Sequence, residues 1–200
     1  MTRSAKILVV EDDRVVARDL AQQLTRLGHS VVGVTARGDD AVRLAIETKP
    51  ELALMDIRLE GAVDGIEAAQ QLRERCRVPV VYLTAYADDR TLERAALTEP
   101  FGYLLKPFDD TQLRTAIEIA LYKYDAERRL RESERRYAVT LASIADAIIA
   151  TDGDAKVTFM NPVAEALTGF SLAEAAGRAL SEVFQIVNEE TRERIVDPAA

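Results

Sequence analysis

The chain of 200 residues has only one cysteine, one histidine and no tryptophan. A disulfide within the chain needs two thiols, and a zinc site needs several Cys or His ligands. With Cys76 and His29 as the single residues of their kinds, the sequence excludes both an internal disulfide and a zinc site of this type. No apolar run is long enough to cross a bilayer, and no secretory signal is present. These absences predict a cytoplasmic protein with a reduced thiol and no membrane span.

The net charge of −8 results from 34 acidic and 26 basic residues. Nucleic-acid binding needs clustered Lys and Arg that displace counterions, so this balance argues against direct DNA binding. The net charge is −4 over residues 1–122, +2 over residues 123–136 and −6 over residues 137–200. The middle stretch, KYDAERRLRESERR, is polar and rich in helix formers, which is typical of a helical connector.

The first 122 residues alternate short β-branched runs with helical patterns, which indicates a doubly wound parallel sheet. The predicted strands are residues 6–10, 30–35, 51–56, 78–84 and 102–105. After the first strand, three- and four-residue spacing predicts one apolar helix stripe, formed by Val15, Val16, Leu20, Leu24 and Leu27. We therefore predict an α/β domain at 1–122, a linker at 123–136 and a second unit at 137–200.

Polar side chains follow the predicted strands at their carboxyl ends. Glu11 and Asp12 follow the first strand, Asp56 ends the third, Thr84 ends the fourth and Lys106 follows the fifth. In open α/β sheets, ligands bind at this edge, where the strand order reverses. Three carboxylates on one rim repel each other, and a hard divalent cation relieves that repulsion, so the set predicts a Mg²⁺ site.

In such a site, Asp56 is the candidate nucleophile that forms an acyl phosphate. The Lys106 ammonium would neutralise one phosphate oxygen and the Thr84 hydroxyl would hydrogen-bond another. Each residue also has an ordinary interpretation, because Glu11 and Asp12 precede a helix that acids can cap, and Lys106 and Thr84 suit a loop and a strand end. Only the joint placement of the five residues favours the functional interpretation.

The motifs ILVVEDD, LMDIRL, VVYLTAYA and FGYLLKPF resemble those of the response-regulator receiver family of two-component signalling, in the same order and spacing. The resemblance covers residues 5 to about 122 and implies a flavodoxin-like fold with strand order 2-1-3-4-5. It also implies that a histidine kinase or phosphotransfer protein phosphorylates Asp56, with Thr84 and Lys106 contacting the phosphate.

The resemblance assigns further roles around the same rim. It implies a Mg²⁺ ion held by Glu11, Asp12, Asp56 and the backbone carbonyl of Arg58. It also implies that Tyr103 is an aromatic switch, which turns inward when Thr84 moves toward the phosphate.

Two features depart from the usual receiver pattern. Glu60 stands where many receivers have a proline, and the stretch DIRLEGAVDG reaches Asp64 one residue later than usual. The loop after the third strand is therefore longer, and we expect its contact with a kinase to differ from that of other receivers. Arg58 and Tyr86 lie where they would flank the site mouth and slow hydrolysis of the phosphoryl group by shielding it from water.

Beyond the connector, DAIIATD, GDAK and VTFMN predict a β-hairpin whose turn is formed by Gly153 and Asp154. A short helix is predicted next, with Asn161 as its cap and Pro162 in its first position. The stretch NPVAEALTGFSLAEAAGR resembles a PAS sensor domain, and the likeness covers roughly residues 137–200.

A PAS fold normally has about 100 residues and three further strands, so we expect residues 137–200 to be the first part of an α+β PAS-like domain in a longer signalling protein. Its ligand pocket would then be incomplete. Since this part contains no His for haem and no Cys for a flavin adduct, no cofactor is expected in it.

No Gly or Pro interrupts the sequence from Asp109 to Asp152, which predicts a long helix that needs a partner helix for support. A weak heptad seam predicts a homodimer through residues 109–144. The seam residues are Ala116, Ile119, Lys123, Ala126, Leu130, Ser133, Tyr137, Thr140 and Ile144. The alternative is a single solvated helix with charged faces.

The predicted function is a phosphorylation-dependent response regulator that relays its state through this helix to the PAS-like unit. It is not a turnover enzyme, since it would catalyse only its own phosphorylation and dephosphorylation. One alternative is a phosphorylation-independent dimerisation module, which the acidic pair and Lys106 oppose. Another is a haloacid dehalogenase type of phosphohydrolase, but that class needs D-x-D and this chain has Arg58 at the second position.

Overall fold

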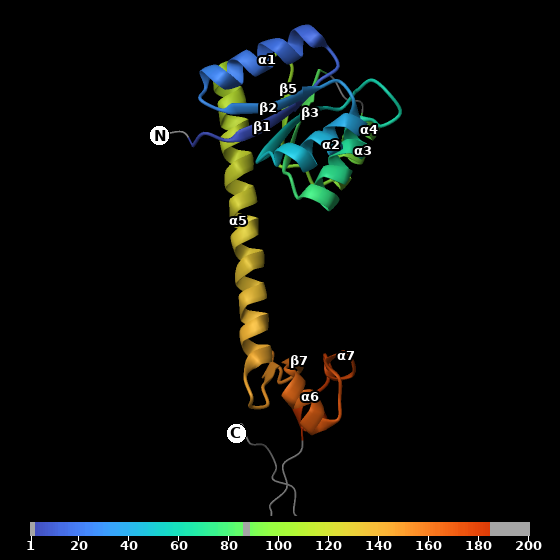
Figure 1. The fold of residues 1–200 in the computed structure, drawn as a ribbon. Coiled ribbons are helices and arrows are strands. Elements are labelled where there is room, and N and C mark those ends of the chain that lie inside the picture. The colour runs from blue at the N-terminus through green and yellow to red at the C-terminus, as the bar shows by residue number, and fades with distance from the viewer. Residues whose placement is uncertain (1–2, 86–88, 185–200) are drawn as a thin grey trace, which may run out of the picture. The chain divides into compact units, whose positions relative to one another are not determined.

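The structure is a computed structural model that describes residues 3–85 and 89–184 (Figure 1). The chain divides into two compact units, Met1–Arg129 and Leu130–Ala200, and each is described by itself.

The first unit contains a five-stranded parallel sheet with the order β2-β1-β3-β4-β5, which confirms the predicted flavodoxin-like topology. The strands are β1 Lys6–Val10, β2 Ser30–Thr35, β3 Leu52–Asp56, β4 Val80–Thr84 and β5 Gly102–Leu105. The third and fourth strands begin later than predicted. For β4 the reason is Pro79, which has no N–H to donate to a neighbouring strand.

The helices of this unit alternate with the strands. They are α1 Arg14–Arg26, α2 Gly38–Thr48, α3 Gly65–Gln71, η1 Leu72–Cys76, α4 Asp89–Leu97 and α5 Asp110–Ser143. The last turn after α3 is a π-helix, which the sequence pattern did not predict. Helix α5 is continuous across the boundary between the two units.

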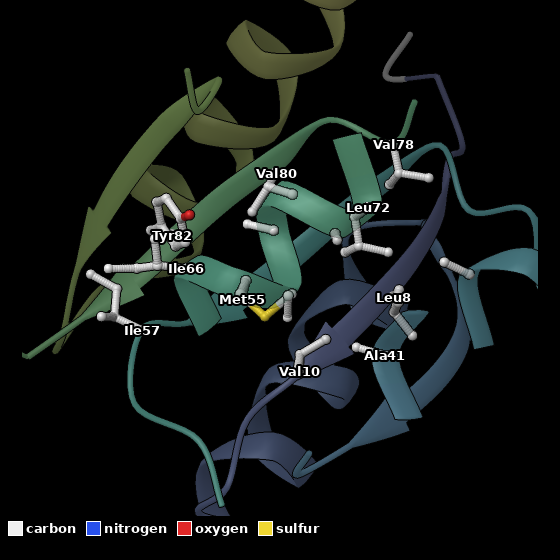
Figure 2. Packing of buried hydrophobic residues seen from close by; sticks show 14 of the residues in the cluster. Leu8, Val10, Ala41, Met55, Ile57, Ile66, Leu72, Val78, Val80 and Tyr82 are labelled. Carbon is white, nitrogen blue, oxygen red and sulfur yellow. The ribbon is translucent and has the colours of Figure 1, made fainter. Parts of the chain in front are cut away.

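Both faces of the sheet are covered, so that β1, β3 and β4 are almost wholly buried. Helices α2, α3 and α4 pack on one face around a core that Figure 2 shows, with Leu8, Val10, Met55 and Tyr82 at its centre. Helices α1 and α5 pack on the other face. The core on that side includes Leu20 and Leu24 of α1 and Leu113, Ile117 and Ala120 of α5.

The predicted stripe on α1 was wrong at one position. Leu20 and Leu24 are buried as predicted, but Val15 is exposed, and the buried residue near the start of the helix is Ala17. Adjacent residues of a helix point about 100° apart, so Val15 and Val16 cannot both face a flat sheet.

The described part of the second unit starts with the end of α5, followed by an antiparallel hairpin and three short helices. These elements are β6 Ile149–Thr151, β7 Val157–Met160, α6 Pro162–Thr168, α7 Leu172–Ala175 and α8 Leu180–Val183. The predicted hairpin is confirmed, as are the Asn161 cap and Pro162 at the start of α6. The predicted turn is also confirmed: Gly153 and Asp154 are its central residues, and the Ala155 N–H donates to the Asp152 carbonyl at 3.2 Å. The Asp152 side chain accepts two further backbone N–H groups.

Candidate functional site

Three acidic side chains meet at the carboxyl edge of the parallel sheet. One carboxylate oxygen each from Glu11, Asp12 and Asp56 lies within 4.8 Å of the others. Glu11 is held at this edge because its backbone N–H donates to the Thr35 carbonyl at 2.9 Å, one residue beyond the end of β1. Residues 44 positions apart in sequence thus share one site.

Lys106 brings the fifth strand to the same site. Its Nζ donates to Glu11 Oε2 at 2.6 Å and to Asp56 Oδ2 at 2.5 Å. Its backbone N–H donates to the Thr84 carbonyl at 2.7 Å, which fixes the start of the segment after β5. The side chains of Glu11, Asp56 and Lys106 are 1%, 14% and 17% exposed, so this ion-pair network is largely shielded from solvent.

The burial of this network alters the proton affinities of two of its groups. Burial raises the pKa of Glu11, and the hydrogen bond from Lys106 only partly offsets that effect. Burial alone would lower the pKa of Lys106, but its hydrogen bonds to Asp56 and Glu11 outweigh burial and raise it. Lys106 is therefore a permanent cation at neutral pH, directed at the carboxylates.

The interpretation of Glu11 and Asp12 as helix caps is wrong. The cap of α1 is Asp13, whose Oδ1 accepts from the backbone N–H groups of Val15 at 2.8 Å and Val16 at 3.2 Å. These hydrogen bonds also lower the pKa of Asp13. Because the third acid of the EDD motif satisfies the helix start, the first two remain available at the sheet edge.

The remaining predicted site residues lie around this centre. Thr84 is buried at the end of β4, and the Arg58 backbone N–H donates to Asp56 Oδ1 at 3.0 Å. Tyr103 is 42% exposed, and its ring centroid lies 5.7 Å from that of Tyr82. Tyr103 thus lies partly in solvent rather than turned into the core. Tyr86, predicted to flank the site mouth, lies outside the described residues.

Tyr82 is a neighbour of the predicted switch that sequence reasoning did not single out. Its hydroxyl pairs with Thr98 Oγ1 at 2.8 Å, and burial raises the pKa of Tyr82 to about 12. A tyrosine in a continuous apolar strand is usually a core residue, and only the sheet register shows that Tyr103 lies opposite it.

Gly65 was noted in the sequence only because the Asp64–Gly65 pair lies one residue later than usual. A Cβ atom on Gly65 would lie 1.9 Å from the backbone oxygen of Asp56, and the Gly65 N–H donates to the Ile57 carbonyl at 3.0 Å. Helix α3 therefore starts in direct contact with the backbone that carries Asp56. The signal that was available is the Asp64–Gly65 pair, because Asp64 caps α3 through the Glu67 N–H.

The family model of the response regulator receiver domain matches residues 7–118, and a model of the PAS fold matches residues 135–197. The first match covers more than half of the chain. The chain therefore belongs to the response regulator receiver family of two-component signalling, with a PAS region after the receiver.

Among known proteins, the transcriptional regulatory protein PdtaR of Mycobacterium tuberculosis is 36% identical to this chain over 119 residues. That match covers 60% of this chain and 58% of PdtaR, so the chain spans less than two thirds of that relative. The signal receiver domain of a modulated diguanylate cyclase from Desulfovibrio desulfuricans G20 is 42% identical, with a TM-score of 0.61, over 62% of this chain and 99% of that structure.

A third relative is described with a bound metal. The receiver domain of the sensor histidine kinase PA1611 from Pseudomonas aeruginosa PAO1, with a magnesium ion in its active site cleft, is 33% identical. Its TM-score is 0.54, over 60% of this chain and 98% of that structure. In the described residues of the present chain, no helix has the length and apolar character of a membrane span.

Proposed function

We propose that this chain is a phosphorylation-dependent switch in which Asp56 accepts a phosphoryl group from a histidine kinase or phosphotransfer protein. The observation that carries the proposal is the Lys106 ammonium, which bonds both Asp56 and Glu11. A lysine held against a carboxylate nucleophile is placed to neutralise the charge that a phosphoryl group brings.

The donor set of the site fits Mg²⁺. Three carboxylates within 4.8 Å supply the oxygen ligands that a hard divalent cation prefers, and the Arg58 carbonyl is the proposed fourth ligand. When bound, the ion would neutralise phosphate oxygens during transfer.

Asp56, Lys106 and Thr84 would have separate roles in phosphoryl transfer. Asp56 supplies the attacking oxygen, the P–N bond of the donor phosphohistidine breaks, and a P–O bond to Asp56 forms. Lys106 neutralises one phosphoryl oxygen and the Thr84 hydroxyl donates to another. The same groups would assist hydrolysis, so the chain turns over only its own phosphoryl group and is not proposed to be an enzyme acting on other substrates.

Acetyl phosphate with Mg²⁺ should add one phosphoryl group to the protein, as intact-mass spectrometry would show. Asp56→Asn should abolish this labelling, because an amide does not form the acyl phosphate. The control is Asp19→Asn, which changes an exposed acid on α1 and should label normally. Undiminished labelling of Asp56→Asn would refute the assignment of the site.

We further propose that phosphorylation is relayed through α5 by a homodimer whose helix seam lies within residues 109–144. Support comes from Leu130 and Tyr137, which are apolar seam residues with 61% and 68% exposure. Lys123, another seam residue, lies over the Phe101 ring of the receiver at 6.0 Å instead. Ile119, an apolar seam residue before Lys123, is also 51% exposed. A weak seam suits a switch, because two packings close in free energy can be biased by phosphorylation.

Analytical ultracentrifugation with and without beryllofluoride and Mg²⁺ would test the dimer. We expect association to strengthen with beryllofluoride, and Leu130→Glu with Tyr137→Glu to abolish it. Insertion of one residue after Leu130 should uncouple association from beryllofluoride, since it rotates the following residues by about 100°. An equally strong dimer in both states would favour the phosphorylation-independent module, and monomers in both states would exclude the dimeric relay.

A further inference from the structure

The loop that joins β3 to α3, residues 57–64, packs along the turn between β2 and α2, residues 36–38. The backbone N–H of Glu60 donates to the Ala36 carbonyl at 3.2 Å, and Arg37 and Glu60 form an isolated parallel bridge. The longer loop of this chain is therefore not free at its centre. It adds a short strand-like contact to the neighbouring turn.

Gly38 fits this contact closely. A Cβ atom on Gly38 would lie 2.7 Å from the backbone oxygen of Val63 and 2.8 Å from Val63 Cγ1. Gly38 is the first residue of α2, where alanine would form the helix more readily. The space occupied by Val63 is thus the physical reason that a glycine suits this position. Val63 also packs against the core cluster of this face.

The two ends of the loop are held as well. At its start, the Arg58 N–H donates to Asp56 Oδ1. At its end, Asp64 caps α3 and accepts from the Arg94 side chain of α4 at 2.8 Å. The segment that contains the Arg58 carbonyl is therefore restrained at both ends and, through Gly38 and Glu60, at its centre.

We propose that the β2–α2 turn, through Gly38, positions the β3–α3 loop for Mg²⁺ binding at the Glu11, Asp12 and Asp56 site. This inference rests on the proposed function, because it assigns the Arg58 carbonyl to the metal. A ligand on a restrained loop loses less conformational freedom on binding, so groups that orient metal ligands affect affinity without touching the ion. Gly38 is a positioning residue in this sense.

The test is Gly38→Ala, with Mg²⁺ affinity measured by isothermal titration calorimetry using magnesium chloride. The added Cβ must push Val63 away, and we expect the dissociation constant to rise about 10-fold, as for other groups that orient metal ligands. Amide hydrogen exchange in residues 58–63 should become faster in the metal-free protein. The matched control is Gly102→Ala, where a Cβ meets only Val81 atoms at 3.7 Å or more, and both readings should stay as in the unaltered protein.

If Gly38→Ala does not fold, Val63→Ala provides a second variant, because it removes packing on the turn without adding a clash. It should raise the dissociation constant by about two- to threefold and speed exchange in the same loop. Mg²⁺ affinity equal to that of the unaltered protein, in folded Gly38→Ala or in Val63→Ala, would overturn the proposal. If the unaltered protein binds no Mg²⁺, the proposed function fails. The hydrogen exchange of the metal-free protein tests the positioning role separately: if exchange in residues 58–63 is equally slow in Gly38→Ala, the turn does not hold the loop.

Discussion

The two units organise buried polar groups in different ways. In the receiver, apolar clusters on both faces of the sheet surround strands that end in charged residues at one edge. In the described part of the second unit, one small apolar cluster formed by Val157, Met160, Ala164, Ala175 and Val183 lies beside a fully buried Asn161. The receiver uses a large core to hold charged residues together at one edge of its sheet, whereas the second unit uses a polar side chain to hold its own backbone together.

The central polar residue of each unit shows this difference. The Lys106 ammonium donates hydrogen bonds to two carboxylates, those of Glu11 and Asp56. The Asn161 amide donates to the carbonyls of Leu141, Ile144 and Asp146, and its Oδ1 accepts from the N–H groups of Ile148 and Ala164. A neutral amide with every bond made inside the protein stabilises architecture, whereas a charged group beside acids at a sheet edge is suited to chemistry.

The strongest test of this comparison is a pair of glycine substitutions, one in each unit. Gly65→Ala places a Cβ 1.9 Å from the Asp56 oxygen and should lower the free energy of unfolding of the receiver by at least about 3 kcal/mol. In Gly153→Ala, the added Cβ meets nothing within 4 Å, so the free energy of unfolding of the second unit should change by less than about 0.5 kcal/mol. Urea unfolding followed by circular dichroism measures both. Similar effects in the two variants would contradict the view that the receiver alone has such tight backbone packing at a glycine.

The next effect is expected in the second unit. Asn161→Ala removes five hydrogen bonds to part-buried or buried backbone groups, among them the buried Ala164 N–H, which should cost about 2–3 kcal/mol locally. Amide exchange in residues 144–164 should become faster while exchange in β1 is unchanged. Asn161→Asp, which keeps the acceptor but loses the donors, should fall between. Equal exchange in Asn161→Ala and the unaltered protein would show that Asn161 does not hold this unit together.

The smallest effect concerns pH and is confined to the receiver, since His29 is the one histidine of the chain. His29 is buried, and its Nδ1 accepts from the Ala5 backbone N–H at 3.3 Å. Burial lowers the pKa of His29, and the nearby Glu118 only partly opposes this. Below the unfolded-state pKa of about 6.5, the unfolded chain binds more protons, so this contribution is complete above that pH and is lost as the pH falls.

We therefore expect the free energy of unfolding to fall below pH 6.5 by no more than about 1.4 kcal/mol per pH unit from this group. His29→Gln should flatten that part of the profile, which denaturant titrations between pH 5 and pH 7 would show. An identical slope in the variant would mean that other groups control acid sensitivity.

Much of the receiver could be predicted because its determinants are local. Five β-branched runs separated by helical patterns predict a doubly wound sheet, and parallel strands bring their carboxyl ends together whatever the detailed packing. The strand pattern therefore predicts that Glu11, Asp12, Asp56 and Lys106 lie at one edge of the sheet. The error on α1 was equally local, since Val15 was assigned to a buried stripe but is exposed.

The end of α5 could not be predicted from composition. No Gly or Pro occurs between Asp109 and Asp152, yet the helix ends at Ser143. The Asn161 side chain, 18 residues further along, donates to the Leu141 and Ile144 carbonyls at the helix end. A stop signal that lies in another element is invisible to a local sequence pattern.

The sequence by itself determined the order of the elements, the acidic and basic residues at the sheet edge and the receiver family. These follow from periodicity and spacing, which are properties of neighbouring residues. Tertiary structure alone decided that Asp13 and not Glu11 or Asp12 caps α1, and that Gly65 and Gly38 give room to the Asp56 and Val63 backbones. Glu11 is held at the sheet edge by the Thr35 carbonyl and Lys106, and the two glycines meet backbone atoms of Asp56 and Val63. These contacts join atoms that are distant in sequence, and only the folded chain brings them together.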